Sequence, residues 1–229
     1  MQYHISTGLI VKHFEQNCGC PLCSIEKIVE NNVCRELLAD GCMDDDVRTI
    51  INAKGFCEKH FDLLFSMPSK LGLALQSDTR LKTLKKHLLT KPLSAQKAKK
   101  QAKKIAEARL TCAVCDYTAE EMVKYYKTIA QMYTHESEWR EKLLNCDGFC
   151  LKHYGKLLEY SHYSFLKAKD YLADLYEIQA KKLDKNAELM QGFLNRHDYR
   201  NLGKPLGESQ KALPLYRAFF YGESEQKSK

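Results

Sequence analysis

The sequence contains no apolar run long enough to cross a bilayer, so it predicts no membrane-spanning helix. Its first 17 residues, MQYHISTGLIVKHFEQN, also lack the basic start, apolar centre and small-residue cleavage site of a signal peptide. Both absences predict a cytoplasmic protein. Thiols stay reduced in that compartment, so the ten cysteines are better candidates for metal ligands or redox groups than for disulfides.

The motifs of several large enzyme classes are also absent. We find no phosphate loop, no GxGxxG, no HExxH and no nucleophile elbow. A catalytic site assembled from scattered residues would leave no such motif, so an enzyme remains an alternative. The preferred hypothesis is an interaction or scaffolding role.

Strand signals are scarce, because no segment alternates apolar and polar residues between turn pairs. Apolar residues instead recur at three-to-four spacing, which is typical of helices, over residues 70–89 and 163–194. The sequence therefore predicts an all-α protein. Shorter helices are expected near residues 22–39, 44–53, 57–67 and 208–221.

One segment occurs twice. GFCEKHF at residues 55–61 returns 93 positions later as GFCLKHY at residues 148–154. Each copy follows a CxxC pair, CPLC or CAVC, and 33 or 34 residues separate the pair from the GFC cysteine. This internal repeat predicts two related helical units, which could pack as one compact domain. Their expected boundaries are 1–92 and 111–229, with a basic helical connector at 93–110.

The repeated residues are of the types that bind metal. Structural zinc takes four ligands in a tetrahedron, commonly three cysteines and one histidine. Two ligands three residues apart at the start of a helix lie on one face and can reach a single ion. The repeated glycine suits a tight turn into that helix, because glycine accepts positive φ. We therefore expect two closed zinc sites per chain, with ligands Cys20, Cys23, Cys57 and His60 in the first half and Cys112, Cys115, Cys150 and His153 in the second.

The sequence leaves alternatives to this arrangement open. The ligands could be exchanged between halves, with Cys20 and Cys23 beside Cys150 and His153. Cys18 makes the first site CGCPLC, so an iron–sulfur cluster is another possibility. A redox dithiol is a further one, although neither CxxC lies in a βαβ pattern. The simplest alternative is that these are buried cysteines without a metal.

The connector is strongly basic. Its segment 94–109 has one acidic residue, Glu107, and six basic residues that could contact nucleic acid or another anion: Lys97, Lys99, Lys100, Lys103, Lys104 and Arg109. A solvated connecting helix with alanine on its packing side is the simpler interpretation. A protein partner is thus the preferred expectation, nucleic acid is the alternative, and no membrane contact is expected.

Several elements in this order resemble a known family. They are CPLC, DDDVRTIINAKGFCEKH, LGLAL, the second CxxC with GFCLKH, and HDYRN at residues 197–201. The combination is similar to an uncharacterised bacterial family of about this length, a domain of unknown function with two Cys/His half-motifs. The resemblance implies metal binding and no particular activity. Members often carry an automatic label as ABC-transporter substrate-binding proteins, but the absent signal peptide and absent α/β alternation argue against that label.

Overall fold

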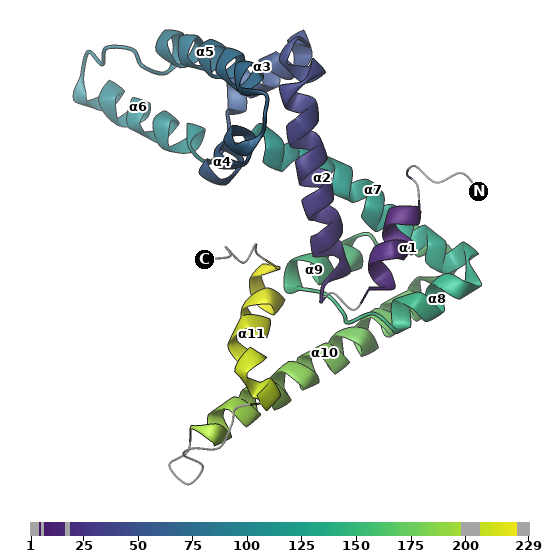
Figure 1. Ribbon diagram of the computed structural model, residues 1–229. Coiled ribbons are helices and arrows are strands. Elements are labelled where there is room, and N and C mark those ends of the chain that lie inside the picture. The colour runs from purple at the N-terminus through teal and green to yellow at the C-terminus, as the bar shows by residue number, and fades with distance from the viewer. Residues whose placement is uncertain (1–4, 6, 17–18, 198–206, 224–229) are drawn as a thin grey trace. The chain divides into compact units, whose positions relative to one another are not determined.

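The computed structural model describes residues 5, 7–16, 19–197 and 207–223, and within them every regular element is helical (Figure 1). This confirms the predicted all-α fold. Two sequence features, Cys18 and the 198–201 part of HDYRN, lie outside the described residues. Among the helices described, none combines the length and apolar character that crossing a membrane requires.

The chain forms two compact units. Unit 1 comprises Met1–Lys27 and Met122–Lys229, and unit 2 comprises Ile28–Glu121. The boundaries between them fall inside α2 (Pro21–Leu38) and α7 (Ala113–His135). The predicted division into 1–92, 93–110 and 111–229 follows the order of the repeat along the sequence. Each compact unit combines one CxxC pair with one GFCxKH segment.

Unit 1 has a core built around the aromatic residues of α1, α7 and α8. Trp139 is buried, and its indole Nε1 donates a hydrogen bond to the Ile129 carbonyl at 3.2 Å. The ring of Phe14 meets that of Trp139 edge-on at 4.8 Å between centroids. Besides parts of α2 and α7, this unit contains α1 (Gly8–Phe14), α8 (Ser137–Leu144), α9 (Leu151–Glu159), η2 (Ser161–Lys167), α10 (Ala168–Arg196), η4 (Gly207–Lys211) and α11 (Ala212–Tyr221).

The long helix α10 supports this core through two polar side chains. Asp174 is buried and accepts hydrogen bonds from Tyr133 Oη at 2.5 Å and from Arg140 Nε at 2.7 Å. Burial alone would raise the pKa of Asp174, but these two donors outweigh it and lower the pKa. Further along α10, Gln179 bonds both the N–H and the carbonyl of Phe149, at 3.2 and 3.1 Å. The second GFC segment is therefore held against α10 by hydrogen bonds between the backbone of Phe149 and the Gln179 side chain.

Unit 2 begins where α2 continues past Lys27. Asp44 caps α3, since its side chain accepts hydrogen bonds from the backbone N–H groups of Asp46 and Val47 at 2.9 and 3.0 Å. Gln76 is buried and donates to the Leu37 carbonyl at 2.6 Å, which joins α5 to the end of α2. The other elements of the unit are η1 (Asp40–Cys42), α3 (Asp45–Lys54), α4 (Glu58–Ser66), α5 (Lys70–His87) and α6 (Ala95–Ala108).

Candidate metal centres

The eight predicted ligands occupy equivalent positions on four helices. In each ligand pair the first residue directly precedes the helix and the second is its third residue. The helices α2, α4, α7 and α9 begin at Pro21, Glu58, Ala113 and Leu151, directly after Cys20, Cys57, Cys112 and Cys150. Both side chains of a pair therefore lie over the first turn, where the free N–H groups and the helix dipole favour the negative charge of a thiolate.

The turns before α4 and α9 require glycine. Gly55 has φ 68° and Gly148 has φ 76°, which are values that other L-residues rarely adopt. A Cβ on Gly148 would also lie 3.0 Å from Lys182 Cδ. The carbonyl of Gly55 accepts a hydrogen bond from the Ala113 N–H at 2.9 Å. This bond places the start of α7, which carries a CxxC pair, beside the first GFC turn.

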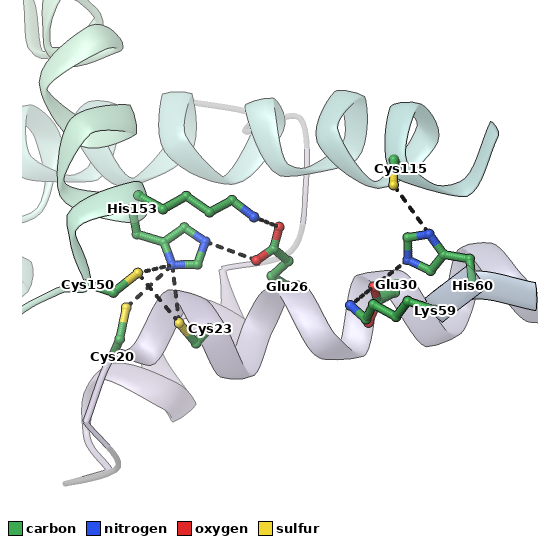
Figure 2. A network of polar contacts seen from close by, with 10 residues as sticks. Cys20, Cys23, Glu26, Glu30, Lys59, His60, Cys115, Cys150 and His153 are labelled. Carbon is green, nitrogen blue, oxygen red and sulfur yellow. Dashed lines mark hydrogen bonds and ion pairs between the residues drawn. The ribbon is translucent and has the colours of Figure 1, made fainter. Parts of the chain in front are cut away.

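Unit 1 brings together Cys20, Cys23, Cys150 and His153 (Figure 2). The Nδ1 atom of His153 lies 3.5, 3.4 and 3.3 Å from the Sγ atoms of Cys20, Cys23 and Cys150 respectively. The Sγ atoms of Cys23 and Cys150 are 3.7 Å apart. His153 and Cys150 are completely buried. The four donor atoms thus face a common point inside the unit.

Unit 2 brings together Cys57, His60, Cys112 and Cys115 in the same way. The Nδ1 atom of His60 lies 3.2, 3.2 and 3.3 Å from the three Sγ atoms of Cys57, Cys112 and Cys115 respectively. His60 and Cys112 are buried, whereas Cys115 is exposed. The two groups therefore share their donor types and differ in access to solvent.

These groups correct the pairing that the sequence favoured. The expected sites joined the CxxC and CxxH of the same half, but each observed group takes its CxxC from one half and its CxxH from the other. The exchanged arrangement, which the sequence had left open, is the one present. The reason is helix length: α2 has 18 residues and spans about 27 Å, whereas the returning helix α3 has ten and spans about 15 Å. The returning chain meets α2 at Glu30, which contacts His60 and lies ten positions after Cys20.

The donor distances suit one tetrahedral ion. Zinc bonds of about 2.3 Å to sulfur and about 2.0 Å to nitrogen place two sulfurs about 3.8 Å apart, and a sulfur and a nitrogen about 3.5 Å apart. The observed separations of 3.7 Å and 3.2–3.5 Å are close to these values. In each group all four donor atoms lie within 4.8 Å of one another. Each group could therefore hold one metal ion.

Two glutamates on α2, which the sequence analysis missed, contact the far side of the histidine rings (Figure 2). Glu30 Oε1 lies 2.5 Å from Nε2 of His60, and Glu26 Oε2 lies 3.3 Å from Nε2 of His153. Each carboxylate also pairs with the lysine that precedes its histidine: Lys59 with Glu30, and Lys152 with Glu26 at 2.5 Å. A carboxylate at Nε2 fixes the ring and leaves Nδ1 for a metal. The repeated Lys of GFCxKH was the available sequence signal.

The charges within the groups support these contacts. Burial would raise the pKa of Glu26, but its contacts with His153 and Lys152 outweigh burial and lower that pKa to about 2. Burial likewise opposes ionisation of Cys112, yet the neighbouring His60 lowers its pKa to about 6. The pKa of Cys150 is lowered by its contacts with the thiols of Cys20 and Cys23. Burial opposes protonation of the two histidines, but their thiol and glutamate contacts outweigh it and raise the pKa of His60 to about 10 and that of His153 to about 11. Each group thus places one thiol of lowered pKa beside an imidazolium.

The end of α11 covers the group in unit 1. Gly222 follows α11 with φ 82°, and a Cβ at this position would lie 3.3 Å from Cys23 Sγ and 3.9 Å from Cys150 Sγ. The next residue, Glu223, accepts a hydrogen bond from the Cys20 N–H at 3.0 Å. Glycine is therefore required for the backbone to pass so close to the thiols.

The basic residues predicted to contact nucleic acid belong to neither donor group and lie on or at the end of another helix, α6. Five lie on α6, and Arg109 is the residue at its C-terminal cap. All six are exposed. The structure thus places them together on a solvated helix.

The chain matches a family of unknown function, DUF6062, over residues 1–227, and it belongs to that family. The Cys/His motifs that suggested the resemblance are those that form the two donor groups. No curated protein and no solved structure matches the chain.

Proposed function

We propose that this protein is a structural zinc protein that binds two zinc ions and serves as a scaffold for a protein partner. The observation that carries the proposal is that each compact unit contains a complete set of four donors, three thiols and an imidazole, at tetrahedral separations. Zinc binding would stabilise each unit by joining two helix starts that are distant in sequence.

A single zinc ion fits the donor groups better than an iron–sulfur cluster. The donor atoms of each group lie within 4.8 Å of one another and point at one centre, whereas a cluster needs room for several iron and sulfide atoms. Thiolate and imidazole together are also a common zinc ligand set.

A structural role is favoured over a catalytic one because a catalytic zinc keeps one coordination position for water or substrate. Here four protein donors converge in each group. The thiolate ligands require a reducing compartment, so we place the protein in the cytoplasm.

Elemental analysis of the protein purified without added metal or chelator, together with its native mass, tests the proposal. We expect two zinc ions per chain. Iron with acid-labile sulfide would favour electron transfer or sensing instead. A folded chain without metal would contradict the proposal, because the donor groups would then be packing motifs.

The glutamates on α2 provide a second prediction. The change Glu30→Gln should lower the zinc affinity of unit 2 by about 10- to 100-fold, because it removes the carboxylate that orients His60. Glu26→Gln should do the same in unit 1 with a smaller effect, since its contact with His153 is longer. Competition with a chromophoric chelator measures both affinities.

The matched control is Glu58→Gln, which changes an exposed carboxylate beside the ligand Cys57. It should leave both affinities unchanged. An equal loss of affinity in Glu58→Gln and Glu30→Gln would show that general charge, and not the contact with the histidine, is responsible.

A further inference from the structure

The helix α6 has a basic side and a small apolar side. At 100° per residue, its five lysines fall within an arc of about 160°. Those lysines are Lys97, Lys99, Lys100, Lys103 and Lys104. The other side consists of Ala95, Ala98, Ala102 and Ile105. No residue of α6 is buried, so the lysine side is fully available to a partner.

The positive charge extends beyond α6 into the end of α5. We call residues 82–109 the basic arm; it has ten Lys and Arg residues and one acidic residue, a net charge of +9, against +7 for the whole chain. All ten basic side chains are exposed. Ion pairs within the described residues join Lys82 to Asp78 at 2.6 Å and Lys103 to Glu107 at 3.8 Å. Most of the charge of the arm is therefore not balanced by these contacts.

Side-chain contacts hold α6, which lies beside α5 (Figure 1), from its middle and from just beyond its C-terminal end. Gln101 Nε2 donates hydrogen bonds to the carbonyls of Leu88 and Thr90 at 2.7 and 2.8 Å, which fastens α6 to the end of α5. Beyond the C-terminal end, Thr111 Oγ1 donates to the Lys54 carbonyl at 2.6 Å. A fixed helix loses less conformational entropy on binding than a flexible basic tail would.

We propose that the basic arm binds the phosphate backbone of double-stranded nucleic acid without reading its sequence. Lysine is a point charge suited to phosphate, and α6 has no arginine for bidentate contacts with bases. Phosphate contacts fix position and carry no sequence information.

Two features of the arm distinguish duplex nucleic acid from other anionic partners. The arm contains no Phe, Tyr or Trp, so it offers no stacking platform for the bases of a single strand. Its apolar side is mainly alanine, whereas helices that insert into a membrane surface present bulky apolar residues. The exposed Leu89 and Leu93 belong to the α5–α6 connection and not to that side.

The test is fluorescence anisotropy of a labelled 20-base-pair duplex of mixed sequence with the full chain in 50 to 200 mM salt. With four to five phosphates contacted, the logarithm of the affinity should fall with the logarithm of salt at a slope of about −4. Replacing the five lysines of α6 with Gln should weaken binding by more than about tenfold and reduce the slope. A matched control replaces five exposed lysines outside the arm: Lys12, Lys167, Lys169, Lys181 and Lys185.

Several outcomes would overturn the proposal. They are an equal loss of affinity in the control variant, tighter binding to a single strand of the same length, equal affinity for poly-glutamate, and binding to phosphatidylserine vesicles without binding to the duplex. The replaced lysines belong to neither donor group, so both five-lysine variants should keep the zinc content of the unaltered chain. The proposal can therefore fail while the structural zinc proposal stands, and the reverse also holds.

Discussion

Replacing Cys150 with Ser should reduce the metal content from two ions per chain to one and destabilise unit 1. Cys150 is completely buried, and its Sγ contacts both Cys23 and His153. Structural zinc contributes about 10 kcal/mol or more of apparent binding free energy at neutral pH, and that free energy is coupled to folding. A loss of even about 4 kcal/mol would lower the melting temperature by roughly 10 °C in a chain of this size.

Metal analysis and thermal unfolding measured by circular dichroism check this prediction. The control is Cys146→Ser, a half-buried cysteine four positions earlier that belongs to neither donor group. It should retain two ions. A Cys150→Ser variant that keeps both ions would show that Cys150 is not a ligand.

The two ions should also leave at different rates when a chelator is added. In unit 2 the ligand Cys115 is exposed, whereas in unit 1 three of the four ligands are buried, Cys23 is half-buried, and Gly222 lies over two of the thiols. A chelator can reach the exposed group directly, but the buried one must first open locally. We expect two phases, with the second at least about tenfold slower because of that opening. The absorbance of a zinc-binding dye follows both phases.

Variants assign the phases to the units. Cys115→Ser should abolish the fast phase, and Cys150→Ser should abolish the slow one. Gly222→Ala should accelerate the slow phase, because the added Cβ would press on Cys23 and disturb the cover of the group. Gly155→Ala is the matched control, since a Cβ there meets no atom within 4 Å. Loss of the slow phase in Cys115→Ser would reverse the assignment of exposed and buried groups.

Most helices could be predicted from the sequence. Which side of a helix is buried could not always be predicted. The periodicity in residues 70–89 predicted a helix, and α5 is present. Yet Leu71, Leu75 and Leu81 of its leucine stripe are exposed, and Gln76 is among the residues buried instead. The hydrogen bond that Gln76 donates to the Leu37 carbonyl at the end of α2 offsets the cost of burying its amide. Such a contact depends on a neighbouring helix, which a periodic pattern does not encode.

The donor residues were accessible to sequence analysis because the repeat marks them. Their grouping was not, since it depends on whether α3 is long enough to return the chain to the start of α2. The two glutamates were hidden for a related reason. Glu26 and Glu30 both come from α2, so they have no equivalents in the second copy of the motif, where Thr118 and Met122 stand at the same distances from the CxxC. Comparing the two copies of the motif therefore identifies the ligands, which both copies contain. It does not identify the two glutamates, which only the first copy contains.

The zinc content of two double variants tests the central claim most directly. If each site combines the CxxC of one half with the CxxH of the other, Cys20→Ser with Cys150→Ser removes two ligands from one site and leaves one zinc ion per chain. Cys20→Ser with Cys57→Ser then removes one ligand from each site and leaves close to none. Sites confined to single halves would give the opposite result, with no zinc in the first variant and one ion in the second.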